Sequence, residues 1–148
     1  MNQPDQLSRE YATILPDLKR IGYRADLKGS YEHERFLVTV SRKPTTRVHA
    51  DGTWIRDDGK TGDGPQDLLR LYREERAAEA WRHWDNHDVK GVAGDILTLS
   101  GHQANSILEA AEKGRGLEVT YHTGRTVESV RITRVRSAFR EAVASLES

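Results

Sequence analysis

The histidines near the end of segment 65–88 are the residues whose spacing could bind a metal ion. His83 and His87 lie four residues apart, and Glu79 lies one helical turn earlier. Because residues four apart project side by side from a helix, these side chains would share one face. Trp84 follows His83, where a metalloprotease helix requires a glutamate. We therefore expect a solvated polar face and no cofactor, with His83 and His87 the candidates if a metal binds.

The most polar stretch, RDDGKTGDGP over residues 56–65, contains fragments of two ligand-binding motifs. Gly59-Lys60-Thr61 resembles the end of a phosphate-binding loop, but Trp54 stands where that motif requires a glycine. Asp57 could begin a calcium loop of the EF-hand type, yet Leu68 occupies the position of its final glutamate. Neither motif is complete, and no Ser–His–Asp order or carboxylate pair stands out. The sequence therefore does not predict an enzyme.

Composition narrows the class of protein. The chain of 148 residues has Lys+Arg 23 and Asp+Glu 23, so it lacks the net basic charge of most nucleic-acid-binding proteins, although a local patch can remain. It has no cysteine, which excludes disulfides and thiolate metal sites. No apolar run approaches the roughly 18 residues of a membrane span, and the start of the chain lacks the pattern of a signal peptide. We expect a soluble, cytoplasmic protein that does not bind membranes.

Apolar spacing predicts a helix followed by antiparallel strands in residues 5–64. The apolar residues of the helix step by four and three: Leu7, Tyr11, Ile14, Leu18 and Ile21. Gly22 follows as the helix stop, and Pro16 predicts a break after Thr13. Alternating apolar residues predict strands around 23–27 and 36–40.

A hairpin is predicted over residues 47–56. Asp51-Gly52 is a favoured two-residue turn, and pairing outward from it places His49 opposite Trp54. The order of a helix, three or four strands and a second helix resembles the topology of double-stranded RNA-binding domains. Because the second helix begins with GDGPQD instead of a lysine cluster, that resemblance implies no RNA-binding function here.

Segment 65–88 reads as one long helix with apolar residues on two faces. Leu68, Leu71 and Tyr72 lie on one side, and Trp81 and Trp84 lie on nearly the opposite side. The first group is expected to pack on the preceding sheet and the tryptophans on the following unit. If the tryptophans are exposed instead, they become a binding surface for a partner.

Residues 89–148 are expected to contain a helix, a hairpin and a closing helix. Ser100 and Gln103 have the spacing of a capping box, which predicts a helix over 101–113. Its buried stripe would consist of four residues: Ala104, Ile107, Leu108 and Ala111. The hairpin covers 117–133, with a bulge near 128–129. Residues 89–98 suit either a short helix or a strand.

If 89–98 is helical, residues 89–133 resemble a winged helix-turn-helix DNA-binding domain. The resemblance implies a recognition helix that begins near Ser100 and a wing whose tip is Arg125. Arg125 would then lie in or near the minor groove. The residues expected near base edges are His102, Gln103, Asn105 and Ser106.

If 89–98 is a strand, the second unit becomes β-α-β-β-α with a locally basic edge. The arginines of that edge with the strongest claim to a binding role are Arg131, Arg134, Arg136 and Arg140. Such a patch could meet phosphates or an acidic protein surface.

Together these patterns predict an α+β protein with two small lobes joined by a long central helix. The expected boundaries are 5–64, 65–88 and 89–148. The expected function is non-catalytic binding or regulation through a protein partner, at Trp81 and Trp84 or at the arginine edge. The alternative is a DNA-binding regulator that uses the winged-helix-like unit. The oligomeric state is left open.

Overall fold

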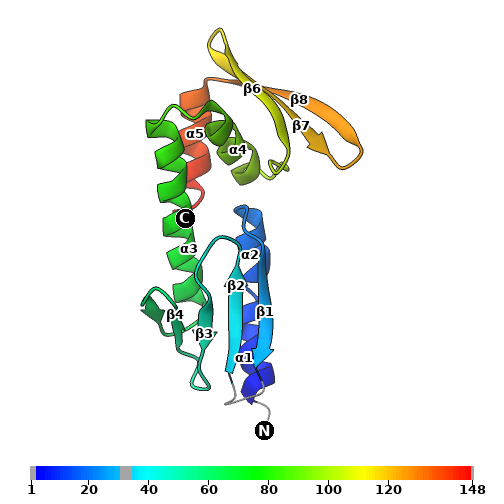
Figure 1. The fold of residues 1–148 in the computed structure, drawn as a ribbon. Helices are drawn as coiled ribbons and strands as arrows, with labels where there is room; N and C mark the ends of the chain where they lie inside the picture. The colour runs from blue at the N-terminus through cyan, green and yellow to red at the C-terminus, as the bar shows by residue number, and fades with distance from the viewer. Residues whose placement is uncertain (1–2, 31–34, 148) are drawn as a thin grey trace. The chain divides into compact units, whose positions relative to one another are not determined.

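A computed structural model describes residues 3–30 and 35–147. It combines helices with two antiparallel sheets, and its longest helix is α3 (Pro65–Asp85), which confirms the predicted α+β class with a long central helix (Figure 1). Residue contacts divide the chain into two compact units, Met1–Tyr72 and Arg73–Ser148. No helix within the described ranges is long and apolar enough to cross a membrane.

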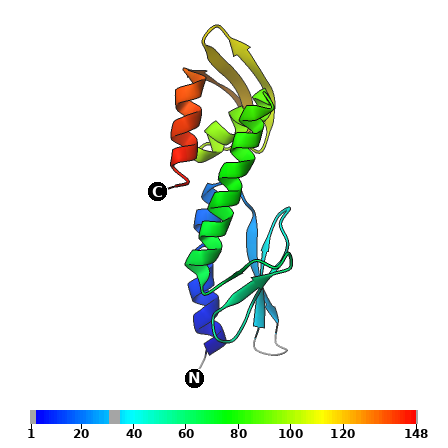
Figure 2. The same cartoon turned by 90° about the vertical axis from the view of Figure 1, so that its left-hand side faces the viewer.

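Unit 1 contains two short helices, a five-stranded sheet and the first two turns of α3. The elements before α3 are α1 (Gln3–Ala12), α2 (Leu15–Arg20), β1 (Ala25–Ser30), β2 (Arg35–Val40), β3 (Thr46–Val48), β4 (Trp54–Arg56) and β5 (Thr61–Gly62). The strands pair antiparallel in chain order. Figures 1 and 2 show the helices of this unit on one face of its sheet.

The N-terminal helix pattern is confirmed. The helix breaks between Ala12 and Leu15, just before Pro16, as the proline predicted. The apolar stripe is buried on both sides of the break, at Tyr11 before it and at Leu18 after it. The Tyr11 hydroxyl donates to the Gly52 carbonyl oxygen at 2.5 Å. Burial raises the pKa of Tyr11 well above its usual range. This bond ties the helix to the β3–β4 hairpin.

The predicted pairing of His49 with Trp54 is wrong, because Trp54 pairs with Val48. The His49 amide donates to the Thr53 carbonyl at 2.9 Å, so the connection has one residue more than a two-residue turn. Gly52, with φ +91, supplies the left-handed residue that this longer loop requires. A shift of one residue changes the face of every side chain. Trp54 therefore points into the core.

The segment that resembled a phosphate loop is a tight turn that leads into β5. Arg56 is buried, and its guanidinium donates to both carboxylate oxygens of Asp58, at 2.9 and 2.6 Å. These bonds lower the pKa of Asp58 to about 2. Gly62 is required because a Cβ there would lie 2.4 Å from the Trp54 ring. Arg56 and Asp58 therefore have a structural role in this turn.

The first half of α3 packs in unit 1 largely as predicted. Leu68 and Tyr72 are buried, and the Tyr72 hydroxyl lies 3.4 Å from Thr46 Oγ1 of β3. Leu71 is half-exposed, however, and Leu69 is buried. At about 100° per residue, position 69 lies closer than position 71 to the face defined by Tyr72.

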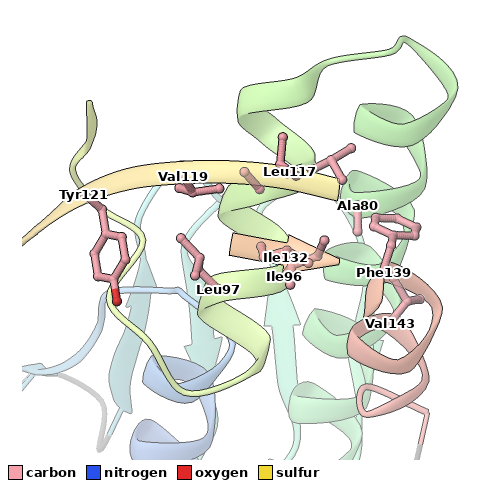
Figure 3. Close-up of a cluster of buried hydrophobic side chains, with 11 residues drawn as sticks. Ala80, Ile96, Leu97, Leu117, Val119, Tyr121, Ile132, Phe139 and Val143 are labelled. Atoms are coloured by element: carbon pink, nitrogen blue, oxygen red, sulfur yellow. The ribbon is translucent and has the colours of Figure 1, made fainter. Parts of the chain in front are cut away.

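Unit 2 contains the remainder of α3, two further helices and a three-stranded antiparallel sheet in the order β6-β7-β8. Its elements after α3 are α4 (Val89–Leu99), β6 (Ile107–Lys113), β7 (Gly116–Thr123), β8 (Thr126–Thr133) and α5 (Val135–Ala144). Helices α4 and α5 cover one face of the sheet (Figures 1 and 2). The core between them, drawn in Figure 3, includes Ala80, Ile96, Leu97, Leu117, Val119, Tyr121, Ile132, Phe139 and Val143.

One local prediction for unit 2 is wrong, and one open alternative is decided in favour of a helix. Residues 101–113 do not form a helix, because β6 occupies 107–113, and residues 89–99 are helical throughout. In β6, Ala110 pairs with Val119 of β7, and this hairpin pairing overrides the helix propensity of LEAAEK. The unit is therefore α-β-β-β-α, and it lacks both the expected recognition helix and the expected first strand.

The bulge of this sheet also lies elsewhere than predicted. The β7–β8 register is regular throughout, whereas the β6–β7 register shifts between Ile107 and Glu109. Leu108 is the extra residue and is exposed. In the regular β8, alternation points Val127 to the uncovered face of the sheet, where it is 56% exposed.

Candidate functional site

A buried ionic cluster lies between the second half of α3 and α4. Asp95 is only 3% exposed. Its Oδ1 lies 2.8 Å from Arg76 Nη1, and its Oδ2 lies 2.7 Å from His83 Nδ1. Each carboxylate oxygen thus has a partner, which offsets the cost of burying the charge. The arrangement also holds the His83 ring in one orientation.

A depression of about 440 Å³ lies beside this cluster. Its wall comes from α3, from α4 with the residue before it, and from the loop before β6. The lining residues are Arg76, His83, Asp88, Lys90, Gly91, Gly94, Asp95, Thr98, Ala104, Asn105, Ser106 and Ile107. We call this feature the Asp95 depression.

Two glycines of α4 shape the Asp95 depression. A Cβ at Gly91 would lie 2.7 Å from the His83 ring, so the imidazole packs against bare helix backbone. A Cβ at Gly94 would meet only Ile107 Cδ1, at an ordinary 3.4 Å. Packing therefore requires glycine at position 91 but not at position 94. Glycine within a helix costs about 1 kcal/mol relative to alanine, and at position 94 it leaves the depression wider.

The two carboxylates that line the depression are already bonded. Arg76 and His83 hold Asp95, and Asp88 accepts from the Gly91 amide at 2.9 Å as the N-cap of α4. Lys90 has no acidic partner among the described residues. Apart from His83, the charged side chains that line the depression are Arg76, Lys90, Asp88 and Asp95, so their formal charges cancel.

The helical histidine pair is not present as predicted. Helix α3 ends at Asp85, and the amides of His87 and Asp88 donate to the Trp84 and His83 carbonyls at 3.1 and 2.9 Å. This is a Schellman motif with His87 in the left-handed position, at φ +54. His87 thus leaves the helical path on which the prediction rested. Within residues 3–30 and 35–147, no group of three or more histidine, aspartate or glutamate side chains could hold a metal ion.

Replacing His87 by glycine is expected to raise the free energy of unfolding by about 1 kcal/mol. A left-handed conformation is strained for a residue with a Cβ and costs glycine little. Urea denaturation measures the change. The His87→Ala variant removes the same imidazole but retains the Cβ, so it should not be stabilised. An equal gain in both variants would show that the imidazole, and not the backbone, is the source of strain.

The tryptophans of α3 pack against α5 of the same unit. Trp84 is partly buried and stacks on Phe139, with ring centroids 4.7 Å apart. Trp81 meets the same ring edge-on at 5.1 Å, yet it remains 40% exposed. The predicted contact of the tryptophans with the second unit is therefore confirmed for both residues, although Trp81 remains partly exposed to solvent.

The predicted arginine edge is divided over three places. Arg136 and Arg140 lie four residues apart on α5 and are exposed. Arg134 precedes α5 in the left-handed conformation, at φ 55. Arg131 pairs with Glu118 in the sheet and points to the face that the helices do not cover. None of these four side chains forms an ion pair within the described part of the chain.

The residues expected near base edges lie in the loop between α4 and β6 instead of on a helix. His102 and Gln103 are exposed, and the His102 amide donates to the Leu97 carbonyl at 2.8 Å, beyond the end of α4. Asn105 and Ser106 line the Asp95 depression. Arg125 is exposed at the tip of the β7–β8 hairpin, as the position of the turn implied.

Sequence reasoning missed Arg76, Lys90 and Asp95 as site residues. Asp95 is the one acidic residue in the largely apolar helix VKGVAGDILTL, between the buried Ala93 and Ile96. A carboxylate on the buried face of such a helix requires a partner. The position of Asp95 would therefore have indicated a buried ion pair if the segment had been known to be helical.

Comparison with known proteins found no family model, curated protein or solved structure that matches this chain.

Proposed function

We propose that this protein is a non-catalytic binding protein that recognises an acidic partner protein through unit 2. The contact surface consists of Trp81, Arg136 and Arg140, and we call it the Trp81–α5 surface. The observation that carries the proposal is the exposure of Trp81. Its side chain is 40% exposed, although its ring packs edge-on against the fully buried Phe139.

An aromatic side chain held in this way suits a binding hot spot. Tryptophan and arginine are enriched among the residues that dominate binding energy. Phe139 is itself held by Trp84, which stacks on its ring. Binding would therefore bury the exposed face of Trp81 without having to order a mobile side chain first, which lowers the entropy cost of association.

Charge supports an acidic partner. Residues four apart on a helix are neighbours, so Arg136 and Arg140 present two positive charges side by side. Both are exposed and lack an acidic partner within the described residues. Complementary charge steers association and selects among partners.

The test measures affinity for a purified partner. A candidate captured from extract of the source cells is purified and titrated calorimetrically against wild type and variants. Trp81→Ala is expected to weaken binding by about 30-fold or more, the effect of losing a hot spot of about 2 kcal/mol. Reversing both charges, as Arg136→Glu/Arg140→Glu, is expected to weaken binding and to flatten its salt dependence. Val127→Ala shortens a more exposed apolar side chain on β8 and is the control.

Two results would count against the proposal. One is a partner that binds the Trp81→Ala variant as tightly as wild type. The other is a shift of duplex DNA at low salt that weakens steeply as salt rises, because such binding depends on phosphate contacts. That result would favour the alternative of a DNA-binding regulator.

A further inference from the structure

We propose that strand β8 binds an extended acidic segment of the partner protein, which pairs with it as a further strand of the unit 2 sheet. This inference deepens the proposed function, on which it rests for the acidic character of the partner. β8 is an outer strand of its sheet, and none of the described residues pairs with it on the side away from β7 (Figure 1). A free edge of this kind can bind an extended peptide through main-chain hydrogen bonds.

Every second residue of β8 directs its main-chain groups away from β7. The Arg134 amide donates to the Arg115 carbonyl at 3.3 Å, one step beyond the pair that Thr133 forms with Gly116. In an antiparallel ladder, pairs that exchange hydrogen bonds alternate with pairs that do not, so the even-numbered residues of β8 bond to β7. The amides and carbonyls that face outward therefore belong to Val127, Ser129, Arg131 and Thr133.

β8 lacks the features that commonly protect the edge of a sheet. Edge strands are usually short, or are blunted by a bulge, a proline or a lysine. β8 runs for 8 residues in regular register with β7, and its sequence TVESVRIT contains neither proline nor lysine. β6, at the other edge, is interrupted by the bulge at Leu108 and ends at Lys113. Of the two edges, that of β8 is therefore the one open to a further strand.

The charge along β8 favours an acidic segment. Arg125 precedes the strand, Arg131 lies within it and Arg134 follows it, and none of the three forms an ion pair within the described part of the chain. Their three positive charges against the one negative charge of Glu128 leave residues 125–134 with a net charge of +2. The strand at the other edge, ILEAAEK, has two glutamates and one lysine. Charge complementarity thus selects the β8 edge for an acidic partner.

The register also predicts the pattern of side chains in the bound segment. Opposite residues of an antiparallel pair lie on the same face of the sheet, so the residue opposite Arg131 lies on the face that the helices leave uncovered. Its neighbour on β7, Glu118, is already bonded to Lys113 at 3.3 Å, which leaves Arg131 to pair with an incoming carboxylate. On the covered face the segment meets Val130 and Ile132, which favour apolar side chains. The segment therefore alternates acidic and apolar residues.

The first experiment titrates the protein with a capped peptide as long as residues 127–133 that alternates glutamate and valine. Amide hydrogen exchange measured by NMR follows the binding. In the free protein the amides of Val127, Ser129 and Arg131 should exchange faster than those of their even-numbered neighbours, and the peptide should slow them. A peptide with lysine in place of glutamate should bind about 10-fold or more weakly. A peptide that is N-methylated at the amides facing β8 should not bind.

A pair of variants at Ser129 tests the main-chain contact directly. Ser129→Pro and Ser129→Ala both remove the hydroxyl that lies 3.0 Å from Thr120 Oγ1, but only the proline removes the outward amide. Proline is tolerated in an edge strand where the amide faces solvent, so the two variants should have similar thermal midpoints. Ser129→Pro should weaken binding of the glutamate peptide about 10-fold or more relative to Ser129→Ala. Val127→Ala keeps its amide and should bind the peptide as wild type does.

Four results would overturn the inference. They are outward amides whose exchange the glutamate peptide leaves unchanged, equal affinity of folded Ser129→Pro and Ser129→Ala, full affinity of the N-methylated peptide, and a concentration-dependent dimer that Ser129→Pro abolishes. The last result would mean that a second copy of the chain occupies the edge.

The same variants separate this inference from the proposed function. Trp81→Ala leaves the β8 edge intact and should bind the glutamate peptide as wild type does. If the purified partner loses affinity for Trp81→Ala but not for Ser129→Pro, the strand pairing is wrong and the Trp81–α5 surface stands. If it loses affinity for Ser129→Pro alone, the partner binds at β8 and the Trp81–α5 surface is wrong.

Discussion

Replacing Asp95 by leucine is expected to lower the free energy of unfolding by about 3–5 kcal/mol. The substitution removes the buried carboxylate that pairs with the Arg76 guanidinium and the His83 ring, and removing one partner of a buried ion pair is among the most destabilising changes in a protein. Arg76→Met is expected to cost less, because the carboxylate of Asp95 keeps its bond to His83 Nδ1. Urea denaturation followed by circular dichroism measures both changes.

The double variant Arg76→Met/Asp95→Leu gives the sharper test. When both charges of a buried pair are replaced by apolar residues of similar volume, the loss is small or absent. The double variant should therefore be more stable than either single variant, with a coupling energy of several kcal/mol. Arg82→Met, at an exposed arginine on the same helix, should change stability by about 0.5 kcal/mol or less. Additive losses in the double variant would mean that the two residues do not act as a pair.

Truncating Phe139 to alanine is expected to cost about 3–5 kcal/mol. The ring is fully buried in the core of unit 2 (Figure 3), and its loss leaves a cavity where it met Trp81 and Trp84. Tryptophan fluorescence should shift to the red at the same time, because both indoles lose an aromatic neighbour and gain contact with water. Urea denaturation gives the free energy and emission spectra give the shift.

Val127→Ala is the matched control for this core truncation. It also shortens an apolar side chain of unit 2, but one that is 56% exposed, so its cost should be below about 0.5 kcal/mol. If Phe139→Ala and Val127→Ala cost the same, Phe139 does not anchor the core. In that case Trp81 would also lose the support on which its proposed role in partner binding rests.

Much of unit 1 follows from local rules. The break before Pro16 follows from the missing amide of proline, and the buried strand positions around Val38 follow from simple alternation. The one-residue error at Trp54 has a local cause too, because Asp51-Gly52 suits loops of two lengths. The sequence therefore predicted the two strands of this hairpin correctly, and the error lay in the length of the loop between them.

The candidate site was only partly within reach of the sequence. Trp81 stands out as a large aromatic residue on a long helix, but its exposure depends on where the Phe139 ring lies. Asp95, Arg76 and His83 come from two helices and have no spacing that marks them as a group. Asn105 and Ser106 were selected for a recognition helix, and the structure places them in the wall of a depression instead.

By itself, the sequence determined the α+β class, the long helix over 65–85 and the neutral, cysteine-free composition. These depend on periodicity, on helix breakers and on residue counts, all of which are local or additive. Only the tertiary structure decided that residues 107–113 form a strand and that Asp95 is buried between Arg76 and His83. Strand β6 forms through its pairing with β7, and the Asp95 carboxylate is buried between residues of α3 and α4. Both outcomes depend on contacts that the local preference of a single segment does not include.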